Sequence, residues 1–279
     1  MREINGTIYS FGLLDTGIIS EVIKNRNDER NALVKLVTGN AMIPCISIWS
    51  ILELRSKPEL YSEFINLFSV IPFCLTKSPH EFFQEELDSY PDPSSIDPFV
   101  FTFSMFNKDP QADLSKFMDK LFNNREVRKA EKTWKNKWKK ESLDSMLSLK
   151  SNFQPKGIWY NADDASRFID EGVPQFVAGE ARNWLKRLLN SNQEFNPHAF
   201  PSIKMSFYTV FYRFYAEDRD PEIPDVFDIL ISSAAPYLDI VITEKFQAEI
   251  FKKVRNRDPF LDHVRIENIN ILRWNHQAG

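Results

Sequence analysis

The first 76 residues alternate between short apolar runs and stretches with helical spacing of apolar positions. Three apolar runs bounded by polar or turn-forming residues predict strands at 7–14, 41–46 and 70–75. The stretches between them predict helices at 18–37 (broken near 25–28), 47–55 and 58–68. Strands that alternate with helices in this way are typical of a parallel α/β sheet.

Local signals define several element ends. Ser47 stands where a helix N-cap is expected. Pro58 lies near the first turn of the next helix, a position that proline favours. After Pro201 the alternation returns. The predicted elements there are an aromatic-rich helix at 203–215, a short helix at 225–235, a strand at 239–243, a helix at 246–254 and a strand at 269–273.

The middle of the chain, residues 77–199, has few β-branched runs and many helix-forming residues. A long helical pattern covers 109–150, and a second covers 168–195 with Gly172-Val173-Pro174 as a predicted break. We therefore predict that residues 1–76 and 200–279 form an α/β core and that 77–199 is a large helical insertion or cap.

The net charge of −4 excludes a polycation, so any contact with nucleic acid must come from a local patch. Residues 125–140 hold eight basic and two acidic side chains and form such a patch. One interpretation has Lys132, Lys135 and Lys139 following a phosphate backbone while Trp134 or Trp138 stacks on an unpaired base. The other has the tryptophans packed on the core and the lysines in solvent.

Cysteine use and apolar run length bear on the cellular setting. Cys45 and Cys74 lie in strand-like runs, which predicts buried thiols in a reducing compartment. Two isolated cysteines and four scattered histidines argue against zinc. No apolar run approaches the roughly 20 residues of a membrane span, and the N-terminus has no signal-peptide pattern. We expect a cytoplasmic protein without membrane contact.

Four acidic residues follow or adjoin the predicted strands. Asp15 closes the first strand, and Glu53 lies on the helix after the second. Asp228 lies on the helix before the 239–243 strand, and Glu244 follows that strand. The carboxyl ends of parallel strands line one crevice, where these carboxylates would repel one another without a cation. An oxygen-only set suits Mg²⁺ or Mn²⁺, which can activate water against a phosphodiester.

Each of these acids also has a structural interpretation. Asp15 could cap the next helix, and Asp228 could be a first-turn acid favoured by the helix dipole. Glu53 could pair with a surface cation. Asp225 lies three residues before Asp228 on the same helix face, so either one could be the ligand. We expect the hydroxyls of Thr243 and Thr16 to bond a carboxylate or a phosphate.

Four segments resemble the motifs of PIN-domain ribonucleases, in order and in spacing from the predicted strands. They are Leu13-Leu14-Asp15-Thr16, 46–54 around Glu53, 228–235 from Asp228 to Ala235, and 239–246 around Thr243-Glu244. The resemblance covers the blocks 1–76 and 200–279. It departs from the family at the fourth motif, where Lys245 stands at the usual place of an Asp and Glu244 comes one position earlier.

The resemblance implies a three-layer α/β/α fold with a parallel central sheet of about five strands. It implies metal binding by Asp15, Glu53 and Asp228, with Glu244 or Asp225 as further candidates, and hydrolysis of RNA. The implied partners are an RNA substrate, an antitoxin or regulatory protein, or a second copy of the chain, as for a toxin or defence nuclease. Two alternatives stay open. One is a catalytically inactive PIN-like binding module, favoured by Lys245, and the other is a structure-specific DNA nuclease.

Overall fold

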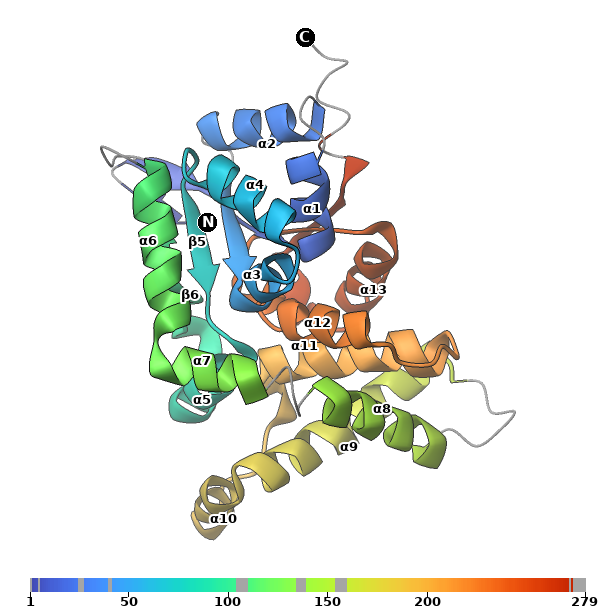
Figure 1. The fold of residues 1–279 in the computed structure, drawn as a ribbon. Coiled ribbons are helices and arrows are strands. Elements are labelled where there is room, and N and C mark those ends of the chain that lie inside the picture. The colour runs from blue at the N-terminus through green and yellow to red at the C-terminus, as the bar shows by residue number, and fades with distance from the viewer. Residues whose placement is uncertain are drawn as a thin grey trace.

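A computed structural model of the chain describes residues 2–4, 6–24, 28–39, 42–103, 110–133, 139–153, 160–270 and 272. Helices surround a central sheet (Figure 1), whose six strands have the order β6-β5-β4-β3-β7-β8. The strands are β3 Phe11–Leu14, β4 Ile43–Ser47, β5 Phe73–Thr76, β6 Phe99–Phe103, β7 Ile240–Thr243 and β8 Arg265–Asn268.

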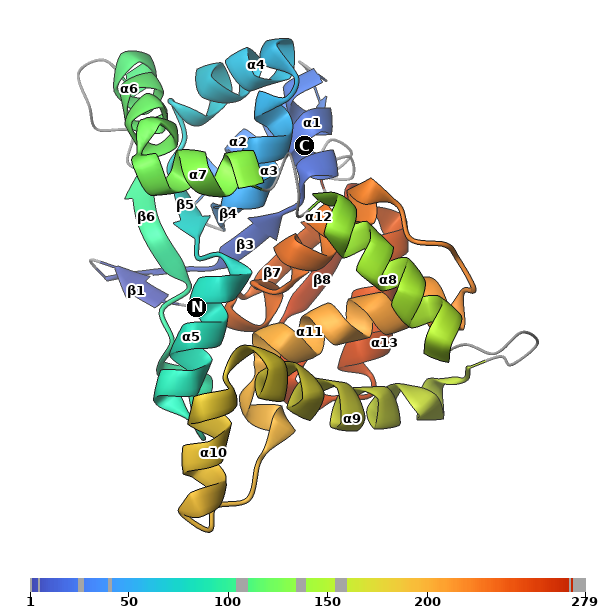
Figure 2. The same cartoon turned by 60° about the horizontal axis from the view of Figure 1, so that its bottom comes forward.

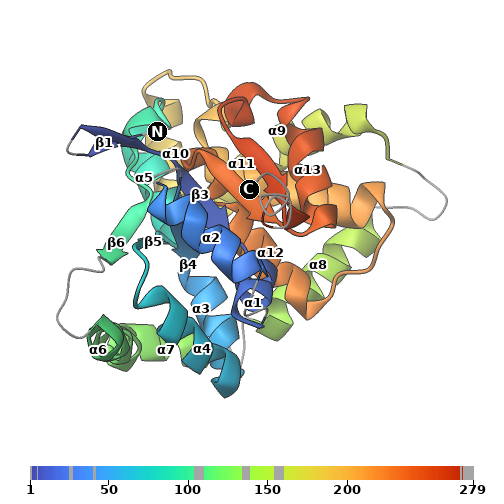
Figure 3. The same ribbon diagram turned by 90° about the horizontal axis from the view of Figure 1, so that it is seen from above.

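All neighbouring strands of this sheet are parallel except β5 and β6, which are antiparallel. From β3 the chain moves outward through β4 and β5, whereas β7 and β8 are added on the other side of β3. The strand order therefore reverses between β3 and β7. Strands β1 (Arg2–Ile4) and β2 (Thr7–Tyr9) form a separate hairpin, and β1 lies out to the side of the main sheet in Figure 3.

Helices cover both faces of the sheet (Figure 2). One face packs against α1 Thr16–Lys24, α2 Asp28–Thr38, α3 Ile48–Arg55, α4 Pro58–Phe68, α6 Pro110–Asn123 and α7 Arg125–Thr133. The other packs against α5 Pro79–Ser89, α8 Lys139–Phe153, α9 Ala162–Glu180, α10 Arg182–Asn190, α11 Pro201–Val210, α12 Ile223–Ser232 and α13 Lys245–Arg255. Successive strand residues alternate between these two cores, so Leu13 and Leu14 of β3 are both buried but on opposite faces. A strand covered on both faces must be apolar throughout, which explains its unbroken hydrophobic run.

The α/β class with a mainly parallel sheet is confirmed, and so are several local predictions. The Ser47 side chain accepts a hydrogen bond from the Trp49 N–H and caps α3. Pro58 begins α4. Cys45 and Cys74 are buried in neighbouring strands, as predicted. The break predicted near 25–28 falls between α1 and α2, although residues 25–27 lie outside the described part of the chain.

Predictions about the strands need three corrections. The sheet has six strands rather than about five, because β6 comes from the segment predicted to be helical. Its five residues are aromatic or β-branched, a strand signal too short to stand out among helix formers. The run at 7–14 is two strands, since β2 pairs with β1 and only β3 enters the main sheet. The last strand lies at Arg265–Asn268, before the predicted 269–273, because these residues pair in register with β7.

The break predicted at 172–174 is wrong, because α9 continues through Pro174 and ends at Glu180. A buried stripe of Ala165, Ile169, Val173 and Val177 faces the core along this helix. Burial of such a stripe can offset the roughly 3 kcal/mol cost of an internal proline. The middle segment thus contributes β6 to the sheet and α9 to the core against α11. No helix in the described ranges combines the length and apolar character needed to cross a membrane.

Candidate active site

The candidate site lies at the carboxyl ends of β3 and β7, the adjacent strands where the strand order reverses. Asp15 directly follows β3, Thr243 is the last residue of β7, and Glu244 comes next. The parallel register pairs Leu14 with Ile242, so the residues that follow each strand are brought together from opposite ends of the chain. Crevices of this kind are the usual ligand sites of open α/β sheets.

The Asp15 carboxylate is held by three donors. Oδ1 accepts the Ile18 N–H at 2.7 Å, which caps α1. Oδ2 accepts the Thr243 hydroxyl and the Glu244 N–H, the latter at 3.1 Å. Burial raises the pKa of Asp15 to about 6; these hydrogen bonds oppose the rise, and the charge of Glu244 adds to it. Asp15 therefore caps α1, and its carboxylate also fixes the end of β7.

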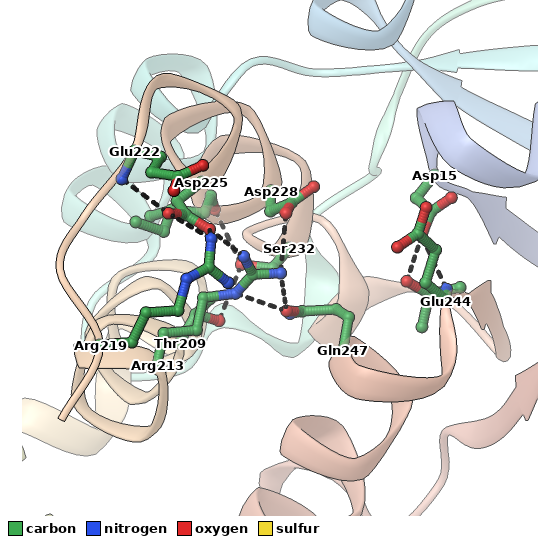
Figure 4. A network of polar contacts seen from close by, with 12 residues as sticks. Asp15, Thr209, Arg213, Arg219, Glu222, Asp225, Asp228, Ser232, Glu244 and Gln247 are labelled. Carbon is green, nitrogen blue, oxygen red and sulfur yellow. Dashed lines mark hydrogen bonds and ion pairs between the residues drawn. The ribbon is translucent and has the colours of Figure 1, made fainter. Parts of the chain in front are cut away.

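Asp228 is the second carboxylate of the site. It lies on α12, with its side chain 37% exposed. Burial raises the pKa of Asp228 to about 7; the nearby Arg213 lowers it, and the charges of Asp15 and Asp225 raise it further. Figure 4 shows Asp228 and Asp15 on opposite sides of one space, without a hydrogen bond between them.

Asp15 and Asp228 line the same narrow pocket. Its other walls are Leu13, Ile231, Ser232, Val241, Thr243, Gln247 and Phe251. The apolar side chains below the two carboxylates reduce their contact with water, which accounts for the effect of burial on both pKa values although Asp228 stays partly exposed. Two carboxylates that face one pocket without a hydrogen bond between them are suited to binding a cation.

Arg213, which the sequence did not single out, provides the cation closest to Asp228. It lies in a π-helical segment, Phe211–Ala216, that follows α11, and it is 4% exposed. Its NH2 group donates to Asp228 Oδ2 and to Gln247 Oε1, both at 2.7 Å, and NH1 donates to Asp225 (Figure 4). Single π-helical turns are frequent at functional sites. The sequence signal was a lone arginine inside an aromatic helix.

Asp225 lies behind this arginine, away from the pocket lining. It is 1% exposed, and its oxygens accept from Arg213, from Arg219 at 2.9 and 3.0 Å, and from the Glu222 N–H at 2.7 Å. The last bond forms a capping box at the start of α12. Of the two acids on this helix, the structure therefore places Asp228 in the pocket and Asp225 in the ion-pair network behind it.

The other predicted acids, Glu53 and Glu244, do not line the pocket. Glu244 is the exposed N-cap residue of α13, and its carboxylate lies against the Cα side of Gly17, where a larger residue would clash. Glu53 is half-buried on α3, which contacts α12 through Trp49 and Phe227 with ring centres 6.5 Å apart. Thr16 is buried, and its hydroxyl has no hydrogen-bond partner among the described residues.

Only part of the predicted basic patch can be placed. Lys132 is exposed in the last turn of α7. Lys135, Trp134 and Trp138 lie outside the described residues, as does the side chain of Lys139, the first residue of α8. The structure therefore leaves the nucleic-acid patch as a prediction.

The donor chemistry of the pocket fits a hard divalent cation, since every candidate ligand is an oxygen. Within the described ranges, no three acidic, histidine or cysteine side chains are grouped closely enough to hold an ion together. Asp15 and Asp228 are the pair brought to one pocket. In comparisons with known proteins, no family model, curated protein or solved structure matches this chain.

Proposed function

We propose that the protein is a divalent-metal-dependent endoribonuclease with a PIN-like core. The observation that carries this proposal is the meeting of Asp15 and Asp228, from distant segments, in one pocket at the reversal of the strand order. Burial raises the pKa of each, and the charge of Asp15 contributes to the rise at Asp228. Both carboxylates would be stabilised as anions by a shared cation.

In this proposal Asp15 and Asp228 hold Mg²⁺ or Mn²⁺, and Glu53 on α3 and Glu244 at the start of α13 are further candidates that would have to move toward the ion to bind it. The ion would polarise a phosphodiester and lower the pKa of a bound water. The contribution of the chain is orientation. The Thr243 hydroxyl and the Glu244 N–H fix one oxygen of Asp15, while Arg213 fixes one oxygen of Asp228.

RNA is the proposed substrate because of the motif resemblance and the basic composition of 125–140. Lys132 is the described member of the three predicted phosphate-binding lysines, and its exposed position is compatible with that role. The helices of the middle segment would then provide the surface that selects the RNA.

The test is incubation of purified protein with total RNA and with tRNA, in Mn²⁺, Mg²⁺ or EDTA. We expect cleavage with metal, and a loss of at least about 10- to 100-fold in Asp15→Asn and Asp228→Asn, since even residues that only support metal ligands contribute that much. Glu180→Gln, an exposed acid at the end of α9, is the matched control and should cleave like wild type. Equal cleavage by Asp15→Asn would remove Asp15 from the mechanism.

One observation favours a second function, an inactive PIN-like module that binds RNA. Arg213 already supplies a buried positive charge to Asp228 at 2.7 Å, so it competes with any metal ion for that carboxylate. Titration of the metal-free protein with Mn²⁺ separates the two functions. The nuclease requires binding that is lost in Asp228→Asn, whereas the inactive module would bind RNA equally well with Mn²⁺ or EDTA and would not cut it.

A further inference from the structure

A second pocket, of about 720 Å³, lies between α9, the first half of α11 and the turn that follows α13. It shares no lining residue with the pocket of Asp15 and Asp228. Its volume is within the range of small-molecule sites, about 300–1,000 Å³. Neither the sequence motifs nor the proposed nuclease reaction uses it.

The floor of this pocket carries a buried lysine. Lys204 is 1% exposed, and its Nζ lies 2.6 Å from Asp258 Oδ2, 2.8 Å from His198 Nδ1 and 4.4 Å from the centre of the Phe260 ring. Asp258 Oδ2 also accepts the Tyr208 hydroxyl at 3.1 Å, so one carboxylate oxygen serves two donors. Burial lowers the pKa of Lys204 against the opposing effect of Asp258. An anion in the pocket would add a further negative charge beside the ammonium and favour its charged form.

Two further donors adjoin this charge. An ammonium can only donate, so His198 accepts from Lys204 at Nδ1 and can present an N–H at Nε2 as a second donor; the residue is exposed. Arg257 faces the pocket from the turn after α13, where it contacts Asp163 at 3.0 Å and Ser166 at 3.4 Å. A guanidinium has five N–H donors in a geometry that suits phosphate. The cationic part of the pocket therefore resembles a phosphate site.

The rest of the lining has a different character. The carboxylate of Asp170 on α9 is exposed at the pocket and would repel a bare phosphate, but it can accept hydrogen bonds from hydroxyl groups. Phe260 and Tyr208 stack with ring centres 6.1 Å apart and give the pocket an aromatic wall. A ligand that satisfies all three parts carries a phosphate, hydroxyls and an apolar face.

We propose that this pocket binds a phosphorylated sugar, either alone or as part of a mononucleotide. The phosphate lies between Arg257 and His198 above the Lys204 ammonium, the sugar hydroxyls donate to Asp170, and Phe260 supports the ring. This site is independent of the nuclease reaction, because it uses other residues and needs no metal.

The test is isothermal titration calorimetry of the full chain in EDTA with ribose 5-phosphate, adenosine monophosphate, adenosine and inorganic phosphate. We expect both phosphorylated sugars to bind, and adenosine and inorganic phosphate to bind at least about tenfold more weakly. Equal affinity of the two phosphorylated sugars identifies the sugar phosphate as the recognised unit, whereas tighter binding of the nucleotide adds stacking of the base. Failure of both to bind at about 1 mM, or equal binding of inorganic phosphate, overturns the proposal.

Variants separate binding from a structural role. Arg257→Gln should weaken binding about 10- to 100-fold through loss of a charged donor. Asp163→Asn removes the same ion pair but keeps the guanidinium, so it should bind like wild type. Lys252→Gln removes one exposed positive charge from α13 outside the pocket and controls for overall charge. An equal loss in Arg257→Gln and either control would show that Arg257 acts only in stability or through net charge, and would refute the site.

Discussion

Replacement of Asp15 by Asn should change how the stability of the metal-free protein depends on pH. Burial raises the pKa of Asp15 from 3.8 to about 6 in the folded state. The folded state therefore favours the protonated form more than the unfolded state does. Well below pH 3.8 Asp15 is protonated in both states and does not change the free energy of unfolding. As the pH rises from 4 to 6, folding becomes less favourable, and above pH 6 the full cost is present.

The size of this cost follows from the shift. At 1.36 kcal/mol per pKa unit, a rise from 3.8 to about 6 corresponds to about 3 kcal/mol. Asn carries no charge, so the stability of Asp15→Asn should lack this dependence on pH. Its amide group, however, would face the Glu244 N–H, which would lose its acceptor. That loss costs about 1–3 kcal/mol at every pH. The expected result is a variant that is less stable than wild type at pH 4.5 and similar or more stable at pH 8.

Urea unfolding in EDTA at pH 4.5, 6 and 8 measures the difference. The stability of wild type relative to Asp15→Asn should fall by about 2–3 kcal/mol between the first and last pH. Glu180 is exposed, so the free energy of unfolding of Glu180→Gln should change with pH as that of wild type does. If the free energies of unfolding of Asp15→Asn and wild type changed in parallel with pH, Asp15 would not be the buried, destabilised carboxylate on which the metal site depends. Mn²⁺ added at pH 8 should then stabilise wild type and not the variant.

Three other outcomes are expected. Asp228→Asn should lower RNA cleavage by at least about 10- to 100-fold. Asp225→Asn should mainly destabilise the protein, because the buried Arg213 and the partly exposed Arg219 both lose a carboxylate partner; a reversed pattern in cleavage and urea assays would exchange the roles of the two acids. In filter-binding assays, Lys132→Glu should weaken RNA binding and make the affinity less dependent on salt concentration. An unchanged dependence on salt would show that Lys132 does not contact the RNA. Tyr237→Phe removes the hydroxyl that donates to the buried Glu86, whose pKa is raised by burial to about 7. The free energy of unfolding should therefore fall by about 1–3 kcal/mol at pH 8 and by less at pH 5. An equal fall at both pH values would mean that Glu86 does not ionise in this range.

The elements of the core were predictable because their signals are local. The apolar run before Asp15 identified a strand that ends at this residue, and Ser47 identified the start of a helix. The position of Asp15 after a central strand followed from the same pattern. Strand β6 was not predictable in the same way, since its pairing with β5 depends on a partner more than 20 residues earlier in the chain.

The sequence by itself determined the position of most strands and helices of the core and which acids follow them, because spacing and capping act over a few residues. Only the tertiary structure decided what those acids meet. It joined Asp15 to Thr243 across 228 positions and placed Asp228 on the same pocket. It also placed Arg213 between Asp225 and Asp228. Such contacts arise from packing of helices on a shared sheet, and no local pattern in the sequence records which distant side chains that packing will bring together.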